Sequence, residues 1–435
     1  MELVAEKYKK SEVGLIPTDW DVKPLVECCS KITDGTHDTP KQVKTGVPFL
    51  TAIHVKENNI DFKGCYYLPE EVHRVIYNRC NPEKDDVLMV NIGAGVATTA
   101  LVNVEYEFSL KNVALLKPNN SILIGSFLNY WQIQSKARII NSISTGGAQP
   151  FLSLNQIGNL RIALPNREEQ TAIATALSDA DALISSLEKL IAKKRNIKQG
   201  AMQKLLNAMD NGQLIIDNEG NNCQLSTNNY QLKEGWEVKK LGSIGKPYGG
   251  LSGKSKLDFA DGKFPYIPFM NIMSNPIIDT SYVDYVNIGV DESQNKALKG
   301  DLFFNGSSET PEEVGMCSVL LEDIPNLYLN SFCFGFRLNK DSKENGLYLS
   351  YYFRSSEGRK LFYSMAQGAT RYNLSKSNFN KMEVSLPKPE EQIEIANILT
   401  DMDNEINALE AKLEKYKNVK LGMMQNLLTG KIRLV

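Results

Sequence analysis

Two polar stretches of the sequence carry side chains that can hydrogen-bond to phosphate oxygens or to the edges of bases. They read TDGTHDTPKQVKTG and GGLSGKSKLDFADGK, and each is followed much later by a Gly-polar turn, STGGAQPFLS or AQGATRYNLS. Hydroxyl, ammonium, imidazole and amide groups all make contacts of that kind. Solvated turns are the alternative interpretation. The candidate contact residues are Thr36, His37, Thr39, Lys41, Lys44 and Gln149, together with Ser252, Lys254, Ser255, Lys256, Arg371 and Asn373.

Recognisable catalytic motifs are missing from the sequence. The stretch YGGLSGKS has Tyr248 where a phosphate-binding loop needs its first glycine, and no amphipathic helix follows it. The Asn/Asp-Pro-Pro-aromatic motif of an adenine methyltransferase does not occur. His37, His54 and His73 have no spacing typical of a metal site. We therefore expect no catalytic residue, no metal ligand and no cofactor in this chain.

The elements that position the polar stretches come from an internal repeat. Residues 164–206 align with 386–428 without a gap, with 21 identities in 43 positions. Upstream, the similarity continues more weakly from Trp20 to Trp236. Each half reads as a Trp-marked entry, a variable region of about 145 residues and a long helix, so the sequence predicts two copies of one fold with different surfaces.

The long helices are predicted from LPNREEQ and LPKPEEQ, where acidic residues open an uninterrupted apolar stripe. In the second copy the stripe holds a 4-3-4-3 spacing from Ile395 to Tyr416, which indicates a coiled-coil seam. About 40 residues make a rod of roughly 60 Å, and the two rods are expected to pack antiparallel about a pseudo-two-fold. The expected packing and partner-binding residues are Glu169, Gln170, Ile173, Leu177, Ile184, Leu187, Glu391, Gln392, Ile395, Leu399, Ile406 and Leu409.

Short β-like runs separated by Gly, Pro, Asn and Asp fill the variable regions, with short helices after them, so the fold class is α+β. We expect two pseudo-two-fold related α+β domains separated by two long antiparallel coiled-coil helices. The expected boundaries are 1–19 for an N-terminal segment packing near the helices, 20–163 for the first domain, 164–209 for the first helix, 210–235 for an Asn/Gly-rich linker, 236–385 for the second domain, and 386–435 for the second helix and tail.

Composition narrows the class of protein. No run of about 18 apolar residues occurs, the first residues lack the apolar core of a secretory signal, and the seven cysteines include no CxxC pair. A cytosolic protein with reduced thiols is the expectation. Cations and anions balance in both variable regions, 14 against 13 in 20–163 and 17 against 17 in 236–385, so neither is the strongly basic domain typical of a DNA binder.

These features together resemble the specificity (S) subunit of type I restriction-modification systems. The motifs that carry the resemblance are GLIPTDWDVKPL and EGWEVKKLGSI before the variable regions, and LPNREEQTAIATALSDADALI and LPKPEEQIEIANILTDMDNEI, with MQKLL and MQNLLTGKIRL, after them. The resemblance covers essentially the whole chain. It implies that each variable region is a target recognition domain that reads one half of a split DNA site, while the helices fix the gap between the halves.

The resemblance also implies partners. Two methyltransferase (M) subunits would carry S-adenosylmethionine and the adenine chemistry, and two restriction (R) subunits would supply ATP- and Mg-dependent translocation and cleavage in a prokaryotic cytoplasm. The chain itself would be a non-catalytic reader of double-stranded DNA, with weak, salt-sensitive binding when isolated. The rival hypotheses are a coiled-coil scaffold whose domains bind proteins or glycans, and an enzyme in its own right.

Overall fold

Two helices of equal length, α5 (Arg167–Leu205) and α11 (Pro389–Leu427), each contain 39 residues, which confirms the predicted long helices. Acidic pairs occupy both first turns, Glu168 with Glu169 and Glu390 with Glu391, where the positive end of the helix dipole stabilises them. The one glycine inside each helix, Gly200 or Gly422, has open space around its α-carbon. Nothing therefore breaks either helix.

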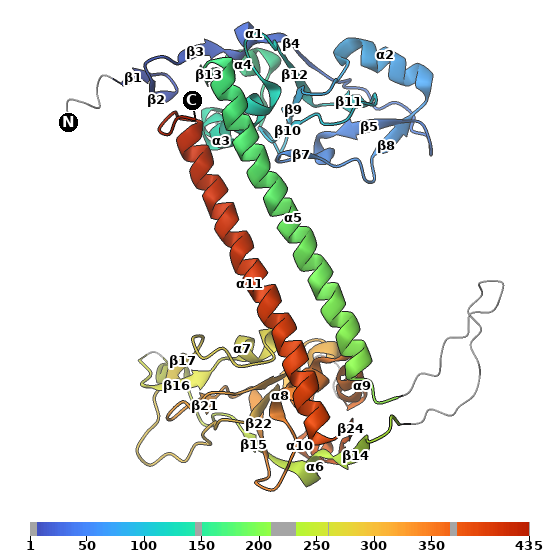
Figure 1. The fold of residues 1–435 in the computed structure, drawn as a ribbon, viewed down its shortest axis with the longest axis vertical. Helices are drawn as coiled ribbons and strands as arrows, with labels where there is room; N and C mark the ends of the chain where they lie inside the picture. Colours follow the sequence, from blue (N-terminus) through green and yellow to red (C-terminus); the bar gives the residue numbers. More distant parts are fainter. Residues whose placement is uncertain (1–6, 144–149, 210–231, 260, 366–371, 435) are drawn as a thin grey trace, which may run out of the picture. The chain divides into compact units, whose positions relative to one another are not determined.

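The computed structural model describes residues 7–143, 150–209, 232–259, 261–365 and 372–434. The chain divides into two compact units, of which unit 1 holds residues 1–189 and 411–435 and unit 2 holds residues 190–410. The predicted linker falls outside the described residues over 210–231. Figure 1 shows α5 and α11 side by side, and each unit contains a stretch of both helices.

Unit 1 is built on a four-stranded sheet of order β10-β9-β12-β4 and a three-stranded sheet of order β11-β5-β8. Smaller pairs join β13 to β3, β1 to β2 and β6 to β7. The strands are β1 (Tyr8–Ser11), β2 (Gly14–Pro17), β3 (Asp21–Pro24), β4 (Cys29–Asp34), β5 (Val47–Thr51), β6 (Val55–Lys56), β7 (Asn59–Ile60), β8 (Tyr66–Leu68), β9 (Val87–Met89), β10 (Thr99–Leu101), β11 (Ser109–Lys111), β12 (Ala114–Pro118) and β13 (Arg161–Leu164). The helices are α1 (Leu25–Cys28), α2 (Glu70–Cys80), α3 (Gly125–Ile143) and α4 (Leu154–Gly158), with a 3-10 turn at Ala52–His54.

Unit 2 repeats this arrangement with sheets of order β15-β22-β18-β20 and β17-β16-β21, and with the pairs β14-β24 and β19-β23. The strands are β14 (Glu237–Lys240), β15 (Gly245–Gly249), β16 (Phe264–Ile267), β17 (Asp284–Val286), β18 (Leu302–Asn305), β19 (Ser307–Ser308), β20 (Cys317–Val319), β21 (Tyr328–Leu329), β22 (Cys333–Leu338), β23 (Tyr372–Asn373) and β24 (Glu383–Leu386). The helices are α6 (Leu241–Ile244), α7 (Phe269–Ser274), α8 (Gly346–Arg354), α9 (Ser356–Met365) and α10 (Lys376–Lys381), with 3-10 turns at Lys256–Phe259 and Pro311–Glu313.

The two units share one topology. Taken along the chain, β4, β9, β10 and β12 occupy the places that β15, β18, β20 and β22 occupy in unit 2, and in both units the three-stranded sheet combines a parallel with an antiparallel pairing. The predicted α+β fold class and the repeat are therefore confirmed. The units differ in one helix, because the single α3 of unit 1 is matched in unit 2 by α8 and α9, which are divided at Ser355. Ser355 has an extended backbone that ends α8, and Gly358 in the first turn of α9 packs so closely on the carbonyl of Tyr352 that a Cβ atom would lie 2.2 Å from it.

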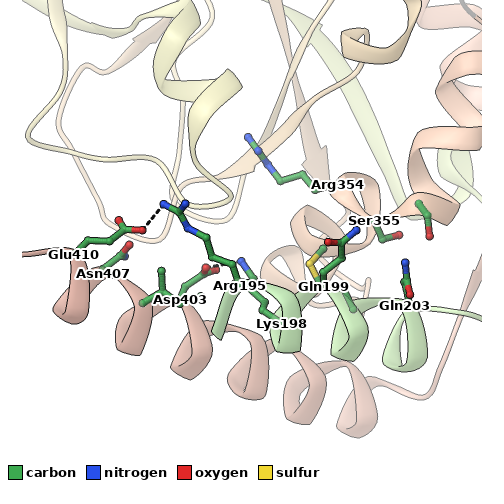
Figure 2. A pocket seen from close by; sticks show the side chains of 12 residues that line it. Arg195, Lys198, Gln199, Gln203, Arg354, Ser355, Asp403, Asn407 and Glu410 are labelled. Atoms are coloured by element: carbon green, nitrogen blue, oxygen red, sulfur yellow. Dashed lines mark hydrogen bonds and ion pairs between the residues drawn. The ribbon is translucent and has the colours of Figure 1, made fainter. Parts of the chain in front are cut away.

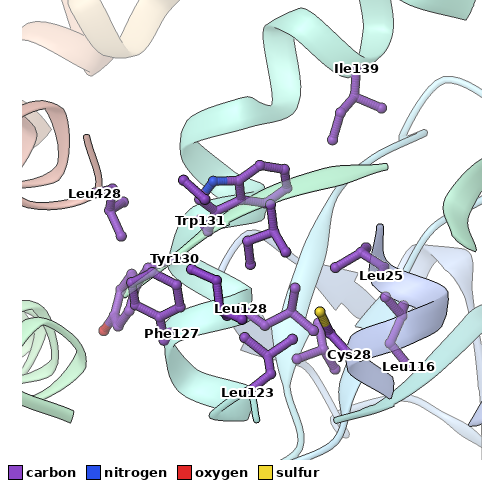
Figure 3. Packing of buried hydrophobic residues seen from close by; sticks show 14 of the residues in the cluster. Leu25, Cys28, Leu116, Leu123, Phe127, Leu128, Tyr130, Trp131, Ile139 and Leu428 are labelled. Carbon is purple, nitrogen blue, oxygen red and sulfur yellow. The ribbon is translucent and has the colours of Figure 1, made fainter. Parts of the chain in front are cut away.

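The cores of the units include the apolar stripes of the long helices. In unit 1, Ile173 and Leu177 of α5 pack into one cluster with Phe127, Trp131 and the fully buried Trp20. Figure 3 shows side chains of α3 in this cluster together with Leu428, which follows α11. In unit 2, Ile395 and Leu399 of α11 pack in the same way onto the aromatic cluster around Phe304. Each long helix is thus anchored in a core by its N-terminal turns.

Candidate functional site

The two polar loops predicted from the sequence leave equivalent strands through equivalent glycines. After β4, the backbone N–H of Gly35 donates to the carbonyl of Val113 at 3.1 Å, and after β15, that of Gly250 donates to the carbonyl of Cys333 at 3.2 Å. A Cβ atom on Gly35 would lie 2.0 Å from a backbone carbonyl oxygen, and one on Gly250 would lie 2.1 Å from another. Only glycine allows so close an approach, so the same turn opens both loops.

In unit 1 the loop forms a connected polar surface. The ring of His37, whose side chain is 62% exposed, lies 2.8 Å from the amide oxygen of Asn112 and 3.1 Å from a carboxylate oxygen of Asp34. Thr39 accepts a hydrogen bond from the ammonium group of Lys111. Thr36 is partly exposed and caps the backbone N–H of Asp38. The structure thus brings the predicted Thr36, His37 and Thr39 together.

Lys41 and Lys44, further along this loop, are exposed. Within the described residues, neither ammonium group has a hydrogen bond or an ion pair. Both cations are therefore available to an anionic partner such as a phosphate.

In unit 2 the equivalent loop is held by its own polar contacts. Ser252 exchanges hydrogen bonds with the side chain of Gln294, and Ser255 donates to Asp258 at 2.8 Å. The bond from the Ser255 backbone N–H is the main reason why the pKa of the Asp258 carboxyl is lowered. Lys256 is exposed at the start of a 3-10 turn.

Lys254 has a different environment from the one that the sequence suggested. Its side chain is only 2% exposed, it forms an ion pair with Glu292, and it donates to the carbonyl of Asn287 at 2.7 Å. An ammonium group held in this way fixes the shape of the loop. A direct contact from Lys254 to a ligand stays a prediction that needs the ion pair to open.

The two Gly-polar turns are only partly described. Gln149 and Arg371 lie outside the described residues. Asn373 is exposed on β23, which pairs with β19, and it has a partner in the structure. Its counterpart in unit 1 is Phe151, which is 49% exposed and bridges to Ile92.

Sequence reasoning missed three residues at these loops. Lys111 and Asn112 reach the first loop because β11 pairs in parallel with β5 and Lys111 forms a separate bridge to Thr36. At the matching place in unit 2, just before β22, stands Phe332, which is 63% exposed. No local pattern marks these positions, because they come from segments more than 60 residues further along the chain.

The predicted packing residues of the long helices are mostly buried. Nine of the twelve are at most 6% exposed: Glu169, Gln170, Ile173, Leu177, Leu187, Gln392, Ile395, Leu399 and Ile406. Ile184, Leu409 and Glu391 are partly exposed.

Gln170 and Gln392 have the same function in the two halves. The Gln170 amide donates to the carbonyls of Ile122 and Pro165 and accepts from the N–H of Ile124. Gln392 donates to the carbonyl of Pro387 and accepts from the N–H of Asn345. Each glutamine therefore ties the start of its long helix to the chain segment before the neighbouring helix, α3 or α8.

Glu169 makes a contact that its counterpart Glu391 lacks among the described residues. Its fully buried carboxylate accepts from the indole N–H of Trp20 at 3.0 Å and from Arg433 at 2.7 Å. Arg433 also binds Asp19 and lies over the Trp20 ring. The hydrogen bond to Glu169 is the main cause that raises the pKa of Arg433, and the bond to Asp19 adds to it. The entry segment, the start of α5 and the tail after α11 are joined at this point.

Within each unit, α5 and α11 are paired by a Tyr–Asp–Lys triad. In unit 1, Tyr130 donates to Asp181 at 2.7 Å, and Lys420 binds the same carboxylate at 2.5 Å. Burial is the main cause that raises the pKa of Tyr130, so its hydroxyl keeps its proton and donates.

In unit 2, Tyr351 donates to Asp403 at 2.8 Å, and Lys198 forms an ion pair with that carboxylate. Figure 2 shows Lys198 and Asp403 on facing helices, beside the Arg195–Glu410 pair. Asp181 corresponds to Asp403 in the repeat, and Lys198 to Lys420. The pairing is therefore reciprocal, as isologous packing requires, and in each unit the helices run antiparallel.

A hollow of about 550 Å³ adjoins this triad in unit 2. Residues of α5, α11 and the α8–α9 corner line it, and the guanidinium of Arg354 at its wall is bonded to backbone carbonyls, among them that of Asn275 at 2.7 Å. Of its charged groups, Arg195 is paired with Glu410 and Lys198 with Asp403, so among the described residues it offers no constellation of nucleophile, base and oxyanion donor.

Metal binding requires a cluster of histidine, cysteine or acidic residues, and thiol reactivity requires a lowered cysteine pKa. No group of three His, Cys, Asp or Glu residues there is placed to hold a metal ion. Burial raises the pKa of the Cys80 thiol to about 11 and that of Cys333 to about 12, which keeps both thiols protonated. Among the described helices, none is long and apolar enough to cross a membrane.

The geometry is that of a repeated frame that carries two different surfaces. Two α+β domains of one topology display different polar loops at the same end of the same sheet, and two long helices pair in antiparallel fashion inside the units. Since function depends on the site and not on the fold, the unlike loops are where the two units can differ in what they bind.

Comparison with known proteins agrees. The family described as "Type I restriction modification DNA specificity domain" matches residues 17–199 and 233–416, so the chain belongs to this family and is a type I restriction-modification specificity subunit, the non-catalytic subunit of such enzymes. The family that the sequence motifs resemble is therefore confirmed as the family of this chain.

Several known proteins are similar to this chain over nearly all of its length. A Methanocaldococcus jannaschii protein assigned as the MjaX type I restriction enzyme specificity subunit is 27% identical, covering 99% of this chain and 97% of that protein. The EcoKI specificity subunit of Escherichia coli K12 is 21% identical, covering 95% and 88%. The crystal structure of the S subunit from M. genitalium has the same fold, with a TM-score of 0.56 and 15% identity over 97% of this chain and 98% of the other.

Proposed function

We propose that each α+β domain of this subunit reads one half of an asymmetric, bipartite DNA site. The observation that carries the proposal is the pair of equivalent loops with unlike side chains, which begin at Gly35 and Gly250. One fold with two different sets of loop side chains suits two different DNA sequences. Hydrogen bonds to base edges specify the sequence, while the shared fold holds the loops in position. The paired helices would set the spacing between the words.

The partners follow from the same proposal. We propose that the surfaces of α5 and α11 left free by their pairing dock two methyltransferase subunits, and that restriction subunits complete the complex in a prokaryotic cytoplasm. S-adenosylmethionine, ATP and Mg would be bound by those partners. A protein chain from a structural study of complex assembly in the type I R-M system has the same fold, with a TM-score of 0.54. This likeness supports the proposal that the present chain is part of such a complex.

Exchange of residues 20–163 for the corresponding region of another specificity subunit tests the proposal. The expected result is a complex that methylates a new sequence in one half of its site and keeps the other half and the spacing. Sequencing of methylated adenines in the DNA of cells that carry the chimera measures both halves at once.

Two outcomes would contradict the proposal. A site that stays the same in both halves would mean that the domain does not read DNA, as expected for a scaffold whose domains bind proteins or glycans. Methyl transfer by the purified chain without partners would make it an enzyme in its own right.

The free cations of the first loop give a second prediction. Replacing both Lys41 and Lys44 with glutamine is expected to weaken binding of the assembled complex to all DNA sequences alike. It should lower the slope of log Kd against log salt by about 2, since each lost phosphate contact removes about 0.9. Fluorescence anisotropy at several salt concentrations measures this slope.

Lys63, an exposed lysine of the same unit outside the loop, is the matched control. Its replacement by glutamine should leave the slope unchanged. Equal slopes for the loop variant and the wild type would remove both lysines from the interface.

A further inference from the structure

A hollow of about 330 Å³ opens at the end of the unit 2 sheet, beside the polar loop that begins at Gly250. Strand β18 ends at Asn305, which is paired with Cys333 at the start of β22, and the lining residues Ser307 and Phe332 lie close to these two strand ends in the chain. The wall of the hollow combines two aromatic rings with hydroxyls and carboxylates. The lining residues are Phe269, Ser307, Ser308, Glu309, Glu313 and Phe332.

The ring of Phe332 is presented by a fixed backbone. Although the residue is 63% exposed, its N–H is bonded to the side-chain oxygen of Asn330 at 2.9 Å, and its carbonyl accepts from Gly306 at 3.0 Å. An exposed aromatic side chain on a rigid turn loses little conformational freedom on binding. It is thus prepared for contact with an apolar surface of a partner.

The carboxylates of the hollow differ in their bonding. Glu313 accepts a hydrogen bond from Ser308 at 2.8 Å. Glu309 is exposed, and among the described residues it has neither a hydrogen bond nor an ion pair. A free carboxylate repels phosphates, so it is unsuited to the DNA backbone, but it accepts hydrogen bonds from the exocyclic amino group of cytosine.

Unit 1 has different chemistry at the place of Phe332. The equivalent residue is Asn112. It immediately precedes Val113, whose carbonyl binds Gly35, just as Phe332 immediately precedes Cys333, whose carbonyl binds Gly250. The amide oxygen of Asn112 lies 2.8 Å from the ring of His37. The first domain thus presents amide, imidazole and ammonium groups where the second presents a phenyl ring and a carboxylate. The two surfaces are complementary to different base edges.

We propose that this hollow reads one step of the second half-site, with Glu309 accepting a hydrogen bond from the N4 amino group of a cytosine. Phe332 packs on the apolar edge of the neighbouring base, for which the 5-methyl group of thymine is the best contact. The inference rests on the proposed function, and it goes further by naming the base and the residue that selects it.

The test uses the chain assembled with its methyltransferase subunits and a DNA library in which each position of the site is varied. Glu309→Ala is expected to lower the preference for cytosine at one position of the second half-site by tenfold or more. The first half-site should keep its preferences. Phe332→Ala should relax the adjacent position, and thermal melting verifies that both variants fold.

Glu312→Ala is the matched control, because Glu312 lies only three residues further along the chain, in the next 3-10 turn, and is exposed but does not line the hollow. It should leave all preferences unchanged. If the wild-type complex is selective and Glu309→Ala keeps every base preference, or if Glu312→Ala has the same effect, the inference is overturned. A wild-type complex without any sequence preference would instead overturn the proposed function.

Discussion

Lys198→Glu is expected to destabilise unit 2 by about 3 kcal/mol, because it replaces the cation of the Tyr351–Asp403–Lys198 triad with a second carboxylate. Both ionic side chains are mostly buried, at 18% and 24% exposed, and a partly buried charge that loses its partner keeps the cost of its desolvation. Urea denaturation followed by the fluorescence of Trp236, which lies in unit 2, measures the effect.

The repeat and the pair supply the controls. Adding Asp403→Lys to Lys198→Glu restores an ion pair of opposite orientation and should recover more than half of the loss, whereas a double variant as unstable as the single one would contradict the pairing. Lys193→Glu, on an exposed position of the same helix, should change stability by less than about 0.5 kcal/mol.

Glu169→Gln is expected to destabilise unit 1 by about 2 kcal/mol. The substitution keeps the size of the side chain but removes the charge that holds Arg433, and a hydrogen bond to a charged group is worth about 1.5–3 kcal/mol. The fluorescence of Trp20 and Trp131, both in unit 1, follows the unfolding of this unit during urea denaturation.

Glu391→Gln at the equivalent position of the repeat is the matched control. Glu391 is partly exposed, and among the described residues it has no hydrogen bond or ion pair, so the change should cost less than about 0.5 kcal/mol. Equal losses for the two variants would mean that the contact with Arg433 does not matter and that both glutamates act only through the helix dipole.

The two glutamates show where the two halves of the repeat differ in structure. The glutamines that follow them make equivalent bonds in both halves, yet Glu169 also joins Trp20 and the tail residue Arg433. The position equivalent to Arg433 in the first half is Asn211, and the position equivalent to Asp19 is Gly235. The repeat is therefore symmetric in its frame and asymmetric at the point where the two ends of the chain meet.

Features that repeat at short range were predictable from the amino-acid sequence. The a/d stripe from Ile395 and the acidic first turns predicted both long helices, and the alignment of the halves predicted one fold used twice. Gly35 and Gly250, which begin the polar loops, lie within the two polar stretches of the sequence, although the sequence did not predict their close contacts with backbone carbonyls. Such features depend on neighbours within a few residues, and those neighbours are visible in the sequence.

The tertiary structure alone decided which polar side chains are free. Lys254 was predicted as a contact residue from its loop position, but Glu292 and a carbonyl hold its ammonium group inside. Asn112 and Phe332 reach the loops only through strand pairings between distant segments. A sequence shows that a lysine or a phenylalanine is present, whereas its burial and its partners depend on long-range packing, which no local pattern encodes.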